Sequence, residues 1–236
     1  MLEVENLTKS FGGLRAIGNV TVGISRGELV GLIGPNGAGK TTLINLITGF
    51  LKPDSGSIKF KGEEIGGLKP YKVARKHIAR TFQIVRSIKD LSTLDNVRVA
   101  CLLAQSKSPD QRAMEILEQV GLKQQRNQLA GNLNFAELKL LEIGRAMACE
   151  PELLLLDEPF AGVSVEMLHN LESLIQTLHE NQLTILLIEH VLRPLMRLSE
   201  RVIVIRHGEK IADGTPRDVS LDKNVIEAYL GASNFA

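Results

Sequence analysis

The sequence has few of the residues that mark several common protein classes. Its 236 residues include no tryptophan, and aromatic residues make up only 4%, which disfavours a platform on which nucleic-acid bases stack. The two cysteines, Cys101 and Cys149, match no metal-ligand spacing, so we expect reduced thiols of a cytosolic protein. The net charge is +1 with both signs mixed along the chain. No basic tract therefore indicates nucleic acid or anionic lipid as a partner.

Long apolar runs are also missing. The N-terminal segment MLEVENLTKSF shows no basic stretch followed by an apolar one, so we expect no secretory signal. The longest apolar runs, ELLLLDE and LTILLIE, have the length of strands and fall far short of the ~20 residues that span a bilayer. Any membrane role would depend on a partner that supplies the span.

What is present is an alternation of strand and helix patterns. LEVENLTKSF and GNVTVGISRGE alternate apolar and polar residues, as half-buried antiparallel strands do, and GSIKFKG predicts a short edge strand. ELVGLIG, ELLLLDEP and LTILLIEH are almost wholly apolar, which is typical of strands buried on both faces. Helical patterns between such strands predict a mainly parallel sheet. RVIVIRHGEKIADG predicts a final antiparallel hairpin that turns at His207 and Gly208.

Residues 91–145 have a different, mostly helical character. Ser92 with Asp95 predicts a capping box at the start of one helix, and Ser108 with Pro109 predicts the start of another. We therefore expect a single domain over residues 1–236. Its α/β core would comprise residues 1–90 and 146–236, and residues 91–145 would form a helical subdomain.

A phosphate-binding loop follows the first buried strand. GPNGAGKT, residues 34–41, matches G-x-x-x-x-G-K-[ST] and precedes a helical pattern. The glycines let backbone N–H groups point at phosphate oxygens, and the helix start adds the positive end of its dipole. Lys40 would reach the β- and γ-phosphates, and the Thr41 hydroxyl would ligate Mg²⁺. The residues expected to bind ATP in this segment are Gly34, Pro35, Asn36, Gly37, Ala38, Gly39, Lys40, Thr41 and Thr42.

Acidic and polar residues downstream complete the pattern of a hydrolytic site. Asp157 ends an apolar strand, where its carboxylate can hold Mg²⁺, and Glu158 can orient or deprotonate the attacking water. Gln83 would sense the metal or the water, and His190 would hydrogen-bond the γ-phosphate. The expected catalytic residues are Glu158, His190, Gln83 and Lys40, and the expected metal ligands are Thr41, Gln83 and Asp157.

The order of these features resembles the ATP-binding subunit of an ABC transporter over essentially the whole chain. MLEVENLTKSFGGLRAI, RTFQIV, HGEKIADGTP and VIEAYLG are similar to the branched-chain amino acid import type. The resemblance implies the P-loop NTPase fold of ABC ATPases, with a mainly parallel core sheet, an N-terminal antiparallel β part and a helical subdomain. It also implies Mg-ATP hydrolysis, two cassettes that sandwich ATP as a homo- or heterodimer, and Phe11 stacked on adenine.

The resemblance implies partners as well. These are membrane-spanning permease subunits, docked at a groove bordered by residues 84–98, and indirectly an extracytoplasmic solute-binding protein. No nucleic acid is expected, and the chain would lie at the cytoplasmic face of the cell membrane. Other readings stay open: a urea or amide importer, a lipid or lipopolysaccharide exporter, a soluble ABC ATPase acting on DNA or ribosomes, and a module that holds ATP without hydrolysing it. Glu158 disfavours the last.

One segment departs from the family pattern. Where the usual signature reads Leu-Ser-Gly-Gly-Gln, the sequence has Leu133, Asn134, Phe135, Ala136 and Glu137. Asn134 can still donate a hydrogen bond to the partner's γ-phosphate, whereas Ala136 adds a Cβ where glycine is usual. Ser164 stands where the family has Asp or Asn in the loop that links the two sites. We therefore expect the partner's ATP to turn over more slowly than ATP at this chain's own loop.

Overall fold

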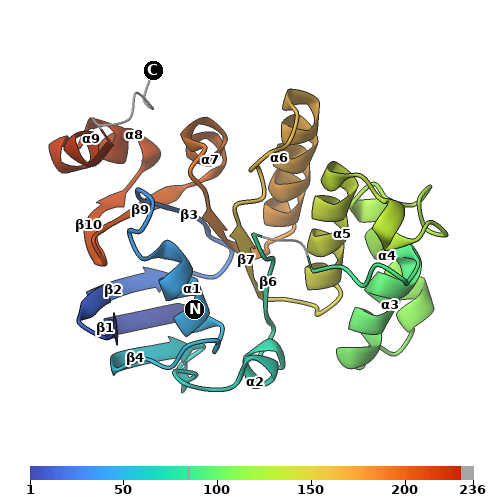
Figure 1. Ribbon diagram of the computed structural model, residues 1–236, viewed down its shortest axis with the longest axis horizontal. Helices are drawn as coiled ribbons and strands as arrows, with labels where there is room; N and C mark the ends of the chain where they lie inside the picture. Colours follow the sequence, from blue (N-terminus) through green and yellow to red (C-terminus); the bar gives the residue numbers. More distant parts are fainter. Residues whose placement is uncertain (84–85, 230–236) are drawn as a thin grey trace.

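Two sheets organise residues 1–83 and 86–229, which the computed structural model describes (Figure 1). Of the segments singled out above, RTFQIV leaves the described residues at Ile84 and Val85, and VIEAYLG leaves them after Tyr229. Within the described part, no helix combines the length and apolarity needed to cross a bilayer.

The first sheet is antiparallel, as predicted, with the strand order β2-β1-β4-β5. Its strands are β1 Leu2–Phe11, β2 Leu14–Ile24, β4 Ser55–Phe60 and β5 Glu63–Glu64. The prediction of an edge strand over GSIKFKG was wrong, because β5 pairs with Lys59 and Phe60 beyond β4. Lys61 and Gly62 both take positive φ, 55° and 80°, and this left-handed turn folds the chain back onto β4.

The second sheet is mainly parallel, also as predicted, with the order β10-β9-β3-β8-β7-β6. Its strands are β3 Leu29–Ile33, β6 Ile78–Arg80, β7 Leu153–Asp157, β8 Thr184–Ile188, β9 Arg201–Arg206 and β10 Glu209–Gly214. Parallel partners flank β3 on both sides, and all of its residues are buried. β10 runs antiparallel to β9 across the predicted turn, where His207 and Gly208 have φ of 50° and 79°.

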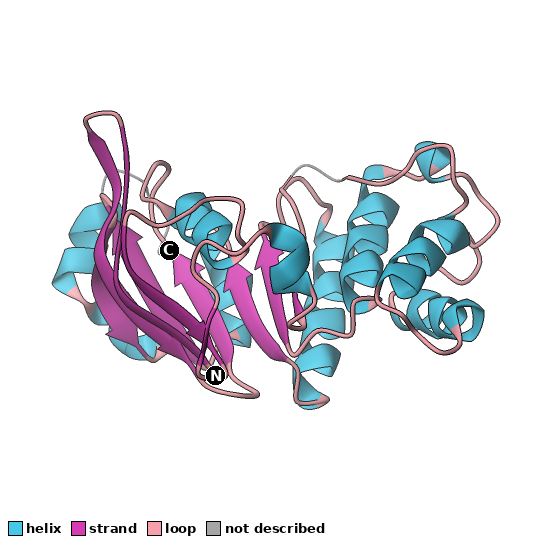
Figure 2. Ribbon diagram, turned by 90° about the horizontal axis from the view of Figure 1, so that it is seen from below, coloured by secondary structure: helices cyan, strands magenta, loops and turns pink. Residues whose placement is uncertain are grey.

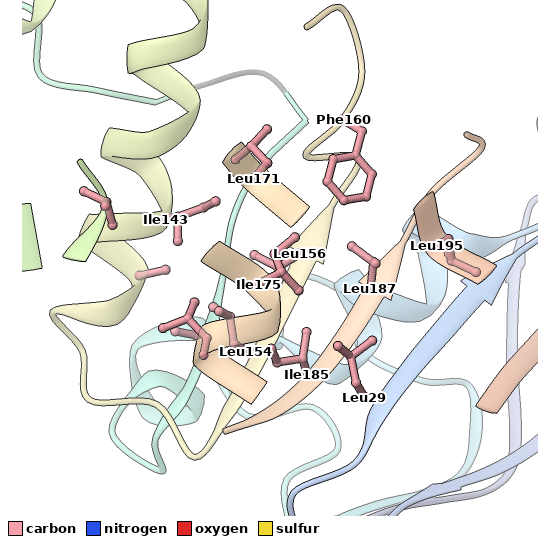
Figure 3. Packing of buried hydrophobic residues seen from close by; sticks show 14 of the residues in the cluster. Leu29, Ile143, Leu154, Leu156, Phe160, Leu171, Ile175, Ile185, Leu187 and Leu195 are labelled. Atoms are coloured by element: carbon pink, nitrogen blue, oxygen red, sulfur yellow. The ribbon is translucent and has the colours of Figure 1, made fainter. Parts of the chain in front are cut away.

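Alternate residues of the parallel sheet build hydrophobic cores on its opposite faces. On one face, Leu154, Leu156, Ile185 and Leu187 share a core with α6 and α7 (Figure 3). On the other face, the intervening residues of the same strands, Leu153 among them, share a core with α1 and the antiparallel sheet. The bounds of these helices are α1 Lys40–Ile47, α6 Val165–Glu180 and α7 Leu192–Leu198. The carboxyl ends of the strands are thus supported from both sides.

A group of helices lies beside the sheet at the end of the molecule away from β10 (Figures 1 and 2). It comprises α3 Thr93–Leu103, α4 Pro109–Gln119 and α5 Phe135–Met147. Ser92 caps α3, because its Oγ accepts the Asp95 N–H at 3.0 Å. Ser108 precedes α4 but makes no capping bond there, since its backbone (φ −135°, ψ 72°) departs from the usual N-cap geometry. The division into residues 1–90, 91–145 and 146–236 stays a prediction.

The remaining elements are short. They are α2 Pro70–Ala74, a 3₁₀ turn at Ala130–Asn132, α8 Pro216–Leu221 and α9 Lys223–Tyr229. The last two lie against β9 and β10 on the side opposite α3–α5 (Figure 1).

Candidate ATP site

The predicted phosphate loop connects the end of β3 to the start of α1. Gly39 precedes the helix with a φ of 107°, a conformation that side-chain-bearing residues rarely adopt. A Cβ on Gly39 would stand 2.6 Å from the carbonyl oxygen of Ala16. Glycine is therefore required here both by the backbone angle and by the close approach of β2. Asn36, Gly37, Ala38, Gly39, Lys40, Thr41 and Thr42 line a cavity of about 350 Å³.

Lys40 is buried at the head of α1 and folds back over its own loop. Its Nζ donates to the carbonyl oxygens of Gly34 at 2.6 Å and Pro35 at 3.2 Å. Burial lowers the pKa of Lys40, and the nearby negative charges of Glu158 and Asp157 oppose that shift. These carboxylates favour the positively charged form of Lys40, and it is this positive charge that would attract an anion.

Glu158 joins Lys40 and Gln83, two other predicted catalytic residues, at the same cavity. Gln83 and Glu158 both line this cavity together with the loop, and Gln83 Nε2 donates to Glu158 Oε2 at 2.8 Å. His190 Nδ1 lies 3.6 Å from the same oxygen. Two residues from distant parts of the sequence, Gln83 and His190, thus converge on the carboxylate of Glu158. Their roles in catalysis stay predictions.

Asp157 is held by a buried ion pair that the sequence does not reveal. Arg80 donates to its Oδ2 at 2.9 Å, and both side chains are almost fully buried. Burial raises the pKa of Asp157, while the charge of Arg80 lowers it. Asp157, Thr41 and Gln83 line a second cavity of about 310 Å³ next to the first. The predicted metal ligands are therefore brought together.

Phe11 is not brought to the phosphate cavity. It lies at the end of β1 with 47% of its surface exposed, and Lys9 Nζ stands 5.7 Å from its ring. From the hairpin of β1 and β2, the residues that line the phosphate cavity are instead Leu14, Arg15 and Ala16. The exposed ring is not a core residue, and its predicted contact with adenine stays a prediction.

The signature segment forms the start of α5. Asn134 is the N-cap: its Oδ1 accepts the Glu137 N–H, and Glu137 Oε2 accepts the Asn134 N–H, both at 2.9 Å. This reciprocal capping box uses the oxygen of the asparagine and leaves its amide N–H groups as donors. Ala136 lies within the helix, where the right-handed backbone accepts a Cβ. Phe135 is half-exposed, and the described walls of this chain's own phosphate cavity contain none of these four residues.

Two residues close to the site were missed from the sequence. Glu189 is completely buried, and its carboxylate accepts the N–H groups of Phe160 at 2.6 Å and His190 at 3.1 Å. These hydrogen bonds join the loops after β7 and β8. Burial raises the pKa of the Glu189 carboxyl group. Its place directly before His190, at the end of an apolar strand, was the available signal. Arg80, the partner of Asp157, carried no comparable signal.

The chain that carries this phosphate loop, the acidic end of β7 and the helices α3–α5 matches known protein families. Residues 17–161 match the ABC transporter family, and residues 209–233 match the branched-chain amino acid ATP-binding cassette transporter family. The chain belongs to the ATP-binding subunits of ABC transporters. The predicted family and fold are thereby confirmed, and this cassette is a nucleotide-binding ATPase.

Individual relatives extend over the whole cassette. It is 41% identical to the high-affinity branched-chain amino acid transport ATP-binding protein BraF of Pseudomonas aeruginosa, with 98% of each chain covered. Identity and coverage are the same for the Escherichia coli protein LivG, which has the same description. The solved ADP conformation of MJ1267, an ATP-binding cassette of an ABC transporter, is similar with a TM-score of 0.89, 33% identity and 98% of both chains covered.

Proposed function

We propose that this cassette hydrolyses ATP to power an importer of branched-chain amino acids. The observation that carries the proposal is the convergence of Gln83 and His190 on the carboxylate of Glu158, which lines the cavity of the phosphate loop. The match of residues 209–233 to branched-chain amino acid cassettes supports the solute class. It favours this class over the urea, amide and lipid transporters that the sequence leaves open.

Glu158 is the group that would activate the attacking water. Its carboxylate stands at the cavity between an amide donor and an imidazole, so it can accept a proton from water placed near the γ-phosphate. Gln83 would orient that water, His190 would donate to the γ-phosphate, and Lys40 would neutralise phosphate charge. Phe11 and residues 34–42 would hold the rest of the nucleotide.

The oxygen groups beside the loop suit a magnesium ion. The Thr41 hydroxyl, the Gln83 amide and the Asp157 carboxylate line one cavity, and Mg²⁺ prefers such oxygen ligands together with phosphate oxygens and water. The donor set therefore fits the metal, and we propose that these three residues hold it. Bound there, Mg²⁺ would supply positive charge to the phosphates. Arg80 keeps the carboxylate of Asp157 oriented at the same edge.

The signature segment would act on the ATP of a second cassette, identical or different. Asn134, Phe135, Ala136 and Glu137 stand on α5, and their capping box leaves the Asn134 amide N–H groups and the helix N-terminus as donors to an anion. Ser164 begins α6 and accepts the Met167 N–H at 3.3 Å. Its Oγ thereby accepts in a cap, and the hydroxyl proton is left to donate.

Membrane-spanning permease subunits are the proposed partners. An apolar groove of about 410 Å³ lies between β6, α2, α3 and α5, lined by residues that include Phe50, Tyr71, Arg86 and Leu103. Leu103 is 79% exposed and Tyr71 53%, which is typical of a surface that a partner covers. We place the cassette at the cytoplasmic face of the membrane, and an extracytoplasmic binding protein would deliver the solute to the permease.

The test of the catalytic proposal is Glu158→Gln, which removes the base and keeps the shape. We expect the ATPase rate to fall about 10²-fold or more, while ATP affinity, measured by nucleotide fluorescence, is unchanged. Glu3→Gln on the exposed face of β1 is the matched control and should hydrolyse ATP normally. Turnover near the wild-type rate in Glu158→Gln would remove this residue from the mechanism.

A further inference from the structure

A lysine lies buried in α5 among backbone carbonyls. Lys139 is 4% exposed, and its Nζ donates to the carbonyl oxygens of Glu158 at 3.1 Å and Gln83 at 3.5 Å. A buried ammonium group costs free energy unless its partners compensate. An unbranched apolar side chain would fill the same space without that cost. A charge at this position therefore points to a task other than packing.

The backbone of Glu158 has a conformation that needs support. Its φ is 51°, in the left-handed region that residues with a Cβ rarely enter. The Glu158 N–H donates to Ile188 O at 2.9 Å. On its other side, the carbonyl receives Lys139 Nζ and, at 3.3 Å, the Ala161 N–H. Bonds at both ends of the residue thus set the direction of its carboxylate.

One turn further along α5, a second buried side chain reaches the same segment. Glu142 Oε1 accepts the N–H of Phe82 at 3.0 Å, next to the carbonyl of Gln83 that Lys139 contacts. Lys139 and Glu142 therefore hold the backbone on both sides of the Gln83 side chain. The hydrogen bond from Gln83 to Glu158 is anchored to α5 from both of its ends.

The other end of this connection is the signature segment. Lys139 Nζ lies 5.6 Å from the ring centroid of Phe135, within the range of a cation–π contact. The same ring stands over Gly162, where a Cβ would come within 3.3 Å of it. Lys139 is thus in contact with the signature segment and with the carbonyl groups of Gln83 and Glu158.

We propose that Lys139 is a positioning residue for ATP hydrolysis: its ammonium group fixes the backbone of Glu158 and Gln83 to the helix that begins in the signature segment. This rests on the proposed function, in which Glu158 activates water. Movement of α5 when the partner's nucleotide is bound would then change the geometry of this chain's own site.

The first test is steady-state ATP hydrolysis by the two-cassette complex that contains the full-length chain with Lys139→Met, which keeps the length and apolar stem of the side chain. We expect kcat to fall about tenfold or more, the effect of losing a hydrogen bond from a charged group. KM for ATP should not change, because no contact of the phosphate loop is altered. Lys139→Arg keeps the charge and the donors and should restore most of kcat. Lys123→Met, which removes an exposed lysine paired with Glu118, is the matched control.

The second test does not depend on turnover. Hydrogen–deuterium exchange at residues 157–162 should become faster in Lys139→Met and not in Lys139→Arg, while α3 and α4 exchange as in the wild type. Unchanged kcat together with unchanged exchange would overturn the proposal. So would faster exchange throughout α3 and α4, because Lys139 would then serve the fold of the helical part. If the wild-type chain hydrolyses no ATP even in the two-cassette complex, the proposed function fails, and exchange at residues 157–162 still decides whether Lys139 holds Glu158.

Discussion

Glu142 should make the stability of this cassette depend on pH around neutrality. Its carboxyl group is buried, and desolvation raises the pKa of Glu142 from 4.5 to about 7, against the opposing effects of the Phe82 N–H and the Lys139 charge. The folded state therefore binds this proton more tightly than the unfolded state. The stability that the fold gains from binding this proton at Glu142 is fully present below pH 4.5 and is lost as pH rises through 7.

Glu142→Gln imitates the protonated form and should remove this dependence. A pKa difference of about 2.5 units corresponds to about 3 kcal/mol in the free energy of unfolding once pH exceeds 7. The glutamine can still accept the Phe82 N–H, so the variant should be more stable than wild type at pH 8.5. About 2 kcal/mol of the difference should develop between pH 5.5 and 8.5.

Urea unfolding at pH 5.5, 6.5, 7.5 and 8.5 measures this difference. Glu3→Gln, on an exposed strand face, is the control for a change of net charge. If the stability curves of wild type and Glu142→Gln run parallel across this range, Glu142 is ionised in the folded protein without cost. The reasoning from its burial would then be refuted.

Substitutions at three further residues test other parts of the structure. Arg80→Met leaves Asp157 buried without its ion-pair partner and should lower the free energy of unfolding by about 3 kcal/mol, measured by urea unfolding; no loss would mean that Asp157 is solvated. Asn134→Ala removes the acceptor for the Glu137 N–H and should cost about 1 kcal/mol, seen as a lower Tm. Asn134→Ser keeps a cap and should raise the ATPase rate of the two-cassette complex, and no gain would count against a weakened partner site. Leu156→Ala opens a cavity in the core under α6 and should cost about 2–5 kcal/mol; a smaller loss would indicate that the core closes around it.

Local patterns in the sequence predicted much of the fold because their causes are local. The apolar run ending at Gly34 became β3, and the glycine before Lys40 adopts the positive φ that its loop requires. The cap at Ser92 also forms as predicted. The prediction that GSIKFKG forms an edge strand was wrong, because a two-residue turn lets Glu63 and Glu64 return and pair with it.

Contacts between distant segments account for what the sequence did not reveal. Arg80 and Asp157 are 77 positions apart, and Phe82 and Glu142 are 60 apart. Lys139 and Glu142 stand among apolar residues in ELKLLEIG and look like the solvated side of an amphipathic helix. They are buried because α5 contacts α3 and α4 as well as β6. Helical periodicity cannot show which polar residue of such a helix is enclosed.

The measurement that tests the central claim most directly is solute uptake by proteoliposomes that contain this cassette with its permease subunits. With ATP on the cassette side and the binding protein on the other, radiolabelled leucine should accumulate with the wild-type chain and not with Glu158→Gln. Hydrolysis of ATP without leucine uptake would contradict the assignment to branched-chain amino acid import. Uptake at the wild-type rate by Glu158→Gln would contradict hydrolysis at this site as its source of energy.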